Sequence, residues 1–248
     1  MMRIAEGLEM LDLEMKLAGR SMMIHPVMIV DKEDWTLIDT GTPGLSGQIL
    51  TYAGQAGIIG RPLSAIVLTH QDIDHIGSLP EFLEMVDTAP LEVYAHEADR
   101  DTIDGKAPLL KFPADSLQAE LATRQDEVRI AFENIFLRPS KPNVTRLLVD
   151  GETLPIGGGL TVIHTPGHTP GHVSLYHQTS KTLIAGDALV INNGELQCSS
   201  PYSTNDMEQA VRSLEKFKPF DIERVVCYHG GLMQGDINRL IEELIAKP

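Results

Sequence analysis

The sequence predicts one α+β domain over residues 1–248, in which two β-rich halves pack face to face with helices outside. Short apolar runs rich in β-branched residues recur in both halves of the chain, and such runs are typical of buried strands. Segments with helical spacing follow them. Residues 36–41 (Thr-Leu-Ile-Asp-Thr-Gly) also resemble residues 182–187 (Thr-Leu-Ile-Ala-Gly-Asp). In both, a short strand delivers an aspartate at or near its end, which fits two related halves.

The first half alternates strands and helices. Continuous apolar runs predict buried strands at residues 27–30, 36–38, 65–68 and 91–95. A turn at residues 42–44 precedes a helix that opens at about residue 47. Ser78 and Glu81 have the spacing of a capping box, with Pro80 in the first turn, and predict a helix through about Met85.

Residues 97–142 have a different character, because charged and helix-favouring residues dominate them. Leu117, Leu121 and Val128 recur at roughly helical spacing, and prolines at 108 and 113 interrupt the helices. We expect a helical lid or insertion over the core. Ordinary surface helices and a dimer surface are the alternatives.

The second half returns to strands and ends in helices. Strands are predicted at residues 145–149, 160–163, 173–176, 182–184 and 225–228. An amphipathic helix is predicted at about 206–217 and a final helix at 236–245.

Composition limits the classes of function. The chain has a formal charge of −15, which argues against nucleic-acid binding and docking on anionic membranes, because both need a basic surface. No apolar run approaches the roughly 18 residues of a membrane span, and Glu6 and Glu9 stand where a signal peptide would be apolar. Two cysteines do not make a disulfide scaffold. We expect a cytoplasmic protein with a small-molecule substrate and no nucleic-acid or membrane partner; a homodimer is left open.

Four side chains that commonly bind metals follow the strand at 65–68. His70 and Asp72 are two residues apart, so an extended chain places both on one face. Asp74 and His75 come where the chain turns toward a helix, which lets their side chains converge with the first pair. A solvated polar turn does not need two histidines and two aspartates packed this tightly, so the pattern indicates a metal site.

A second group of histidines occupies a loop with two Pro-Gly turns at residues 164–172. Because proline breaks any helix there, the three histidines cannot share a helix face. His168 lies in the middle of this rigid loop and is the best candidate ligand. We expect His164 and His172 to make structural hydrogen bonds.

Two more strand ends deliver metal-binding residue types. Asp187 follows the strand at 182–184, and His229 follows the strand at 225–228. Each signal is weak alone, but four strand ends that each deliver such a residue point to one centre. We interpret Cys227, beside His229, as a buried residue and not as a ligand.

Taken in order, the motifs His-x-Asp-x-Asp-His, Pro-Gly-His-Thr-Pro-Gly-His, Gly-Asp and His-Gly resemble those of the metallo-β-lactamase fold superfamily of metallohydrolases. Residues 37–41 also match, and the motifs together extend from about residue 25 to residue 231. The resemblance implies a four-layer αβ/βα sandwich. It also implies two divalent metal ions, with zinc as the first choice and manganese or iron as alternatives. It says little about the substrate, because one fold carries many chemistries.

The resemblance implies a role for each matching residue. Two groups of three side chains would each hold one metal: His70, Asp72 and His168, and Asp74, His75 and His229. Asp187 would bridge the two metals together with a hydroxide. Asp39 would orient a ligand from behind. Asp74 would also act as the catalytic residue that moves a proton to the leaving group.

Asp72 departs from the usual motif, which has histidine at this position. A carboxylate still binds metals, and flavodiiron relatives have an acid here. Three aspartates and a hydroxide neutralise two divalent ions, whereas the histidine version keeps one positive charge. A neutral centre is a weaker Lewis acid, and the additional oxygen ligand favours manganese or iron over zinc. Whether one or two metals bind is therefore open.

We expect a metal-dependent hydrolase in which the bridging hydroxide attacks the carbonyl of a small ester or lactone. The alternatives are a glyoxalase-II-like thioesterase and a phosphodiester hydrolase. A redox di-iron protein and a non-catalytic metal-binding protein rank below them. A β-lactamase would need a signal peptide for export.

Few residues bear on the substrate. Lactonase relatives have a tyrosine three residues after the bridging aspartate, where this chain has Val190. Tyr202 in the following loop is the candidate substrate-binding residue, and an ordinary loop aromatic is the alternative. A thioesterase would need cations to bind glutathione, and the 97–142 segment offers four of them, with a solvated surface as their alternative role: Lys106, Lys111, Arg138 and Lys141.

Overall fold

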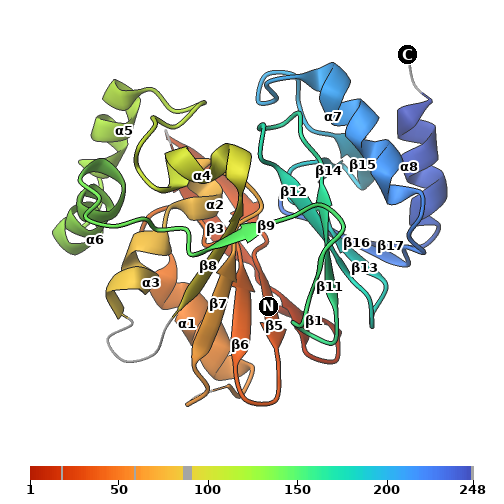
Figure 1. Ribbon diagram of the computed structural model, residues 1–248, viewed down its shortest axis with the longest axis horizontal. Helices are drawn as coiled ribbons and strands as arrows, with labels where there is room; N and C mark the ends of the chain where they lie inside the picture. The colour runs from red at the N-terminus through yellow and green to blue at the C-terminus, as the bar shows by residue number, and fades with distance from the viewer. Residues whose placement is uncertain (18, 59, 86–90, 247–248) are drawn as a thin grey trace.

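In the computed structural model, two β-sheets face each other and helices cover both outer faces (Figure 1). The structure describes residues 1–248 except 18, 59, 86–90 and 247–248. Three apolar cores separate the four layers: one between the first sheet and its helices, one between the two sheets, and one between the second sheet and the last helices. The predicted αβ/βα sandwich is therefore confirmed.

The first sheet has seven strands in the order β1-β2-β5-β6-β7-β8-β9. Their bounds are Met2–Ala5, Leu8–Met10, Val27–Val30, Trp35–Ile38, Leu63–Val67, Glu92–His96 and Arg146–Leu148. Strands β6 to β9 run parallel, so their carboxyl ends lie at the same edge of the sheet. A separate antiparallel pair, β3 (Leu13–Leu17) and β4 (Arg20–Ile24), precedes β5.

The second sheet has six strands in the order β10-β11-β12-β13-β16-β17. Their bounds are Thr153–Leu154, Leu160–His164, Val173–His177, Thr182–Ile184, Arg224–Cys227 and Gly231–Gln234. β13 and β16 run parallel, and β11 runs in the same direction because β12 is antiparallel to both β11 and β13. The carboxyl ends of these three strands therefore meet at one edge. An antiparallel pair, β14 (Leu189–Asn192) and β15 (Glu195–Cys198), lies outside this sheet.

Helices pack on the outer faces in two sets. The helices are α1 Ser46–Gln55, α2 Ile73–Ile76, α3 Leu79–Met85, α4 Glu97–Ile103, α5 Ala114–Leu121, α6 Asp126–Phe132, α7 Met207–Ser213 and α8 Ile237–Ile245. A π-helical turn, Glu133–Leu137, continues α6, and a 3₁₀ turn, Leu214–Phe217, continues α7. Helices α1 and α3 lie outside the first sheet with α5 and α6 beyond them, and α7 and α8 cover the second (Figure 1).

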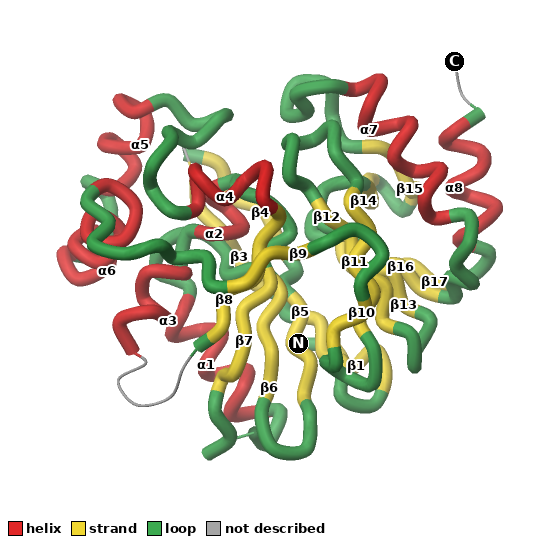
Figure 2. The backbone as a smooth tube through the Cα atoms, viewed as in Figure 1, coloured by secondary structure: helices red, strands yellow, loops and turns green. Residues whose placement is uncertain are grey.

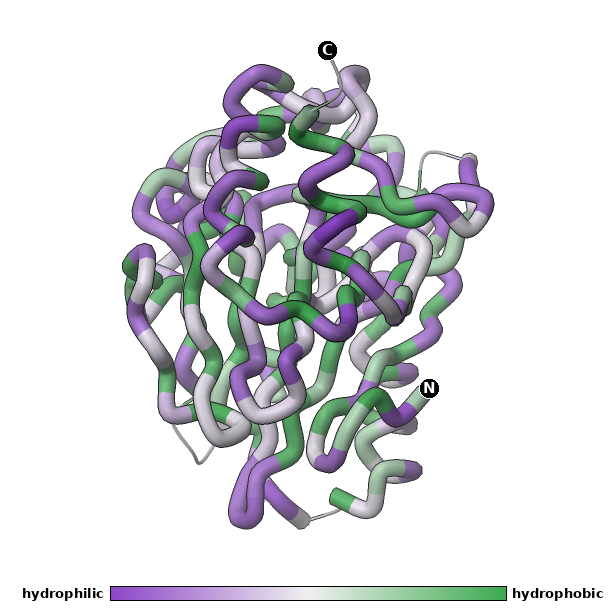
Figure 3. Tube along the Cα trace, turned by 90° about the vertical axis from the view of Figure 1, so that its right-hand side faces the viewer, coloured by the Kyte–Doolittle hydropathy of each residue, from purple (hydrophilic) through white to green (hydrophobic). Residues whose placement is uncertain are grey.

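Hydrophobic stretches follow the interior strands, whereas many turns are hydrophilic (Figure 3). The amphipathic face of α8 shows why its helix packs where it does, because Ile237, Ile241 and Leu244 are all buried in the core beside β16. Within the described residues, no helix is long and apolar enough to span a bilayer.

The capping box predicted at Ser78 and Glu81 is wrong, although the helix itself exists. The Ser78 hydroxyl accepts a hydrogen bond from the Leu45 N–H at 2.9 Å. The Glu81 carboxylate accepts one from the Gly44 N–H at 2.6 Å and another from the Ser46 hydroxyl. Both side chains therefore bind the start of α1, because tertiary packing offers them donors there.

The 97–142 segment consists of α4, α5, α6 and the π-helical turn, joined by loops (Figure 2). Its apolar side chains join the core outside the first sheet, among them Leu117, Leu121 and Phe132. The predicted helices are therefore confirmed. That the segment acts as a lid stays a prediction.

Candidate metal centre

The structure brings together all seven residues predicted as metal ligands. Four follow β7, one lies in the loop after β11, and the other two follow β13 and β16, so both sheets contribute. Three groups of three have their ligand atoms within 4.8 Å of one another, and two of these groups have no residue in common. We call His70, Asp72 and His168 the first ligand group, and Asp74, His75 and His229 the second ligand group.

Asp187 lies between the two groups. Its Oδ2 is 3.3 Å from His168 Nε2 and 3.4 Å from His229 Nε2. Its Oδ1 is 3.4 Å from His75 Nε2. One carboxylate therefore faces histidines of both groups, which is the position expected for a shared ligand.

One threonine and one aspartate fix the orientation of two candidate ligands. The Thr69 hydroxyl donates to Asp39 Oδ2 at 2.7 Å, and it therefore accepts from His70 Nδ1, which lies 3.0 Å away. His75 Nδ1 donates to Asp39 Oδ2 at 2.8 Å. With its proton on Nδ1, each ring in its neutral form has the Nε2 lone pair available to a metal at the centre. Asp39 thus occupies the supporting position that the sequence predicts.

Several buried atoms in the centre fit a bound metal. Nε2 of His70, Nε2 of His75 and Oδ1 of Asp187 are buried without a hydrogen-bond partner within the described part of the chain. These three residues also form a group whose ligand atoms lie within 4.8 Å of one another. Burying such atoms without a partner is unfavourable. A mixed set of imidazoles and carboxylates suits zinc, manganese or iron, so the residues present fit the predicted metals.

Electrostatics in the centre favours positive charge. Burial lowers the pKa of His75, but Asp39, Asp187 and Asp74 outweigh burial and raise that pKa well above its usual range. Asp187 and Asp74 likewise overcome burial at His229 and raise its pKa to about 10. The carboxylates therefore stabilise a positive charge in the centre. This charge is either that of a protonated imidazole or that of a metal ion that replaces the proton.

His172 and His164 make structural contacts, as expected. His172 Nε2 accepts the Asp187 N–H at 2.9 Å, and its Nδ1 lies 2.9 Å from the Thr165 hydroxyl. Burial lowers the pKa of His172 well below its usual range, which keeps the ring neutral. His164 Nε2 lies 3.0 Å from the Pro170 carbonyl. His172 therefore holds the backbone of Asp187 in place.

The sequence reasoning missed Asp99, a buried carboxylate on α4. Its Oδ1 accepts hydrogen bonds from Gln71 Nε2 at 3.1 Å and from the Gly171 N–H at 2.8 Å. Its Oδ2 accepts from the Gln71 N–H at 3.1 Å and from the Thr169 hydroxyl at 2.6 Å. Asp99 therefore ties the loop after β7 to the loop after β11, and these loops carry all three residues of the first ligand group. Nothing in the local sequence of α4 signals this role.

The sequence reasoning also missed Tyr228, although it precedes His229. Its ring stacks on His75 with centroids 3.7 Å apart. Its hydroxyl donates a hydrogen bond to the Asp74 carbonyl. Tyr228 therefore supports two residues of the second ligand group from the second sheet.

Besides Asp99 on α4, the 97–142 segment contacts the centre through its loop between α4 and α5. Gln71 Oε1 accepts the Leu110 N–H at 3.3 Å, and Lys111 Nζ lies 2.7 Å from Asp72 Oδ2. The other cations of the segment behave differently: Lys106 pairs with Asp104 and Asp101, Arg138 pairs with Glu133, and Lys141 is exposed. Lys111 is therefore the member of this set that reaches the centre.

Three further predictions concern single residues. Tyr202 is fully exposed at the surface, and its role in substrate binding stays a prediction. Two residues further on, the Thr204 hydroxyl lies 3.3 Å from His168 Nδ1, so this loop does approach the centre. Val190 lies on β14 and is half-buried. Cys227 is fully buried, and burial raises the pKa of its thiol, which agrees with a packing role.

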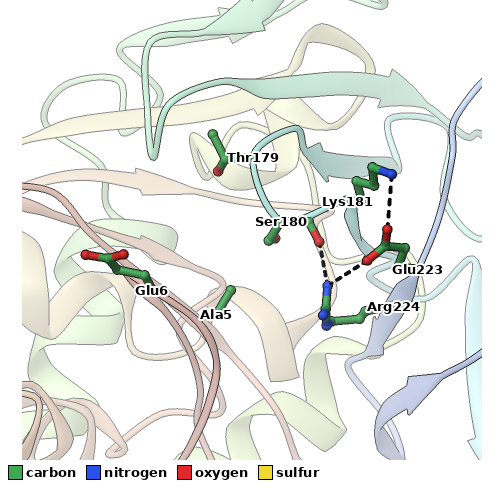
Figure 4. A pocket seen from close by; sticks show the side chains of 7 residues that line it. All are labelled: Ala5, Glu6, Thr179, Ser180, Lys181, Glu223 and Arg224. Atoms are coloured by element: carbon green, nitrogen blue, oxygen red, sulfur yellow. Dashed lines mark hydrogen bonds and ion pairs between the residues drawn. The ribbon is translucent and has the colours of Figure 1, made fainter.

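A hollow lies away from this centre, at the opposite ends of the strands. It has a volume of about 530 Å³ and adjoins the starts of β13 and β16 (Figure 4). Its cations are already paired: Lys181 binds Asp221 and Glu223, and Arg224 binds Glu223 and the Ser180 carbonyl. The described residues that line the hollow therefore offer no unpaired cation to a ligand, and they include none of the seven candidate ligands.

Comparisons with known proteins agree with this geometry. Residues 22–229 match the family described as the metallo-beta-lactamase superfamily. The chain is 32% identical over 219 residues to "Probable metallo-hydrolase YflN" of Bacillus subtilis (strain 168), covering 83% of this chain and 78% of that protein. It is 29% identical over 174 residues to a hydroxyacylglutathione hydrolase of Synechococcus sp. (strain JA-2-3B'a(2-13)), covering 69% and 51%.

A solved structure with the same fold is the metallo-beta-lactamase family protein TTHA1429 of Thermus thermophilus. The TM-score is 0.70 at 25% sequence identity, and the match covers 98% of this chain and 80% of that one. The matched family spans the strands and loops that carry all seven candidate ligands. The chain belongs to the metallo-beta-lactamase superfamily and is a metal-dependent hydrolase.

Proposed function

We propose that the protein uses two divalent metal ions to hydrolyse a carboxylic ester, with a small ester or lactone as substrate. The convergence of seven imidazole and carboxylate side chains around unpartnered buried atoms supports this proposal. Asp187 faces both ligand groups, which supports two ions over one. Zinc is the metal that we propose first. Manganese or iron is the alternative, because three carboxylates provide oxygen ligands, which these metals prefer.

When bound, the metal ions would activate water and polarise the substrate carbonyl. The chain's own residues do the rest. Asp39 and Thr69 keep the His70 and His75 lone pairs directed at the centre, so no ring has to reorient before reaction. Asp74 is partly exposed and points Oδ2 at His229 Nε2, 3.3 Å away. Its Oδ1 is left to carry a proton to the leaving group.

Solvent reaches the centre on one side. The side chains of Asp72, Asp74, His229 and Lys111 are 14%, 15%, 24% and 20% exposed, whereas those of His70 and His75 are fully buried. A substrate would enter over the exposed side chains. We propose a small molecule of the cytoplasm as the substrate. Nucleic acid is disfavoured as a substrate by the net charge of −15.

A thioester is the second candidate substrate. The relative named hydroxyacylglutathione hydrolase supports it. The position of Lys111 beside the centre also supports it, because the ammonium of this residue would attract an acidic thioester substrate. Phosphodiester hydrolysis has no comparable support.

The test combines elemental analysis of protein purified without chelator with hydrolysis assays on lactones, aryl esters, thioesters and phosphodiesters. About two equivalents of metal with lactone or ester turnover support the first candidate. Thioester turnover alone supports the second. Stable folded protein with no metal and no turnover would contradict both.

A further inference from the structure

The ammonium of Lys111 contacts a carboxylate oxygen of the first ligand group. Its Nζ lies 2.7 Å from Asp72 Oδ2. The same oxygen is 3.3 Å from His70 Nε2 and 3.0 Å from His168 Nε2. It is therefore the atom that both imidazoles face, and a metal held by this group would bind it.

The second ligand group has no such cation. Within the described residues, no lysine or arginine nitrogen lies within 4.0 Å of the carboxylates of Asp74 or Asp187. The contrast is between two otherwise similar groups, each with two imidazoles and one carboxylate of its own. An ammonium at one carboxylate and not at the other makes the two groups electrostatically different.

Two effects of Lys111 oppose metal binding at the first group. The ammonium occupies Asp72 Oδ2, so a metal has to take or share that oxygen. The positive charge also remains close to the bound ion, and it is only partly screened because the Lys111 side chain is 20% exposed. The charge of the ammonium also neutralises the negative charge of one of the three carboxylates in the centre.

Resting on the proposed two-metal function, we propose that Lys111 is a positioning residue that makes the first ligand group the weaker metal site and keeps one additional positive charge in the loaded centre. The loop between α4 and α5 brings this charge to Asp72 from 39 residues away in the chain. The 97–142 segment thus adjusts the metal centre in addition to covering the core.

The test is a titration of metal-free protein with zinc and, separately, manganese, in competition with a chelator of known affinity. We expect two binding steps in the wild type. Lys111→Met should tighten the weaker step by about tenfold and leave the stronger step unchanged, because the repulsion acts on the first group. Lys111→Arg should keep both wild-type values. A lysine that only stabilised the loop would loosen binding when removed, so the sign of the change separates the two roles.

Lys141→Met is the matched control, because it removes the same charge from an exposed lysine of the same segment and should change neither step. Lys111→Gln provides a second neutral variant if Lys111→Met does not fold by circular dichroism. The proposal is overturned if the wild-type steps have equal affinity, or if neutral variants leave the weaker step unchanged or loosen it. Wild-type protein that binds no metal overturns the proposed function as well, so the two failures are distinguishable.

Discussion

The two ligand groups are supported in different ways. In the second group, His75 is fully buried between Asp39, which accepts its Nδ1 proton at 2.8 Å, and Tyr228, which stacks on its ring. In the first group, Asp72 contacts the Lys111 ammonium. The second group is thus held by buried partners from the two sheets. In the first group, His70 shares the support of Asp39 through Thr69, whereas Asp72 and the loop of His168 depend on contacts with the 97–142 segment. The second group therefore has the more rigid surroundings, whereas the metal affinity of the first group depends on a segment outside the two sheets.

Asp187→Asn should have the largest effect, because this carboxylate faces both groups. We expect both metal-binding steps to weaken by more than about 100-fold, which exceeds the usual cost of changing an outer partner. Elemental analysis and chelator competition measure the loss. Asp221→Asn is the control, since its side chain is 73% exposed. Loss of one step alone would show that Asp187 belongs to one group.

Asp39→Asn should weaken the second group most, because Asp39 contacts His75 directly and His70 only through Thr69. The carboxylate accepts the Thr69 N–H at Oδ1 and both the Thr69 hydroxyl and His75 at Oδ2, whereas an amide turns its NH2 group toward one of these sets of donors, so the fixed orientation of the ring is weakened. We expect the stronger metal-binding step to weaken by about 10–100-fold. If only the weaker step changes, the assignment of the two steps to the two groups is reversed.

Asp99→Asn should act mainly on the first group, because Asp99 ties the loop after β7 to the loop after β11. We expect about tenfold weaker binding at the weaker step and a loss of about 1–3 kcal/mol in the free energy of unfolding, from buried donors left unpaired. Denaturant unfolding and chelator competition measure the two quantities. Asp101→Asn, on the same helix and 74% exposed, is the control. An equal effect on both steps would contradict the division between the groups.

Cys227→Ala should have the smallest effect on metal. The thiol is fully buried in the apolar core between the second sheet and the last helices, and it belongs to none of the groups of ligand atoms found among the described residues. We expect unchanged metal content and a loss of about 1 kcal/mol in stability from the smaller side chain. A fall in metal content would make Cys227 a ligand after all.

The fold was predictable where strands are continuous apolar runs. β5 and β13 begin and end at the predicted residues, because Val27–Val30 and Thr182–Ile184 carry a buried pattern in the sequence itself. The strands before residue 25 were missed. In β4, for example, four of five residues are exposed, and the strand exists because it pairs with β3. Local sequence does not encode such a partner.

The candidate ligands could be selected from the sequence for a similar reason. The residue types of His70 to His75 are unusual for a turn, so their concentration after a strand stands out in the sequence. The supporting residues have no such signal. Asp99 and Lys111 reach the centre only through the path of the 97–142 segment, and they lie 28 and 39 positions along the chain from Gln71 and Asp72, which they contact. Tertiary structure decides such contacts, and a single sequence does not reveal them.

The two sheets supply the candidate ligands together, and this has a consequence for folding. A metal held by His70 from the first sheet and by His168 from the second would cross-link the two halves of the chain. By linkage, free metal at 100 times its dissociation constant adds about 2.7 kcal/mol to the stability of the folded state. The melting temperature would then follow the free metal concentration, and metal starvation would lower the amount of folded enzyme as well as its activity.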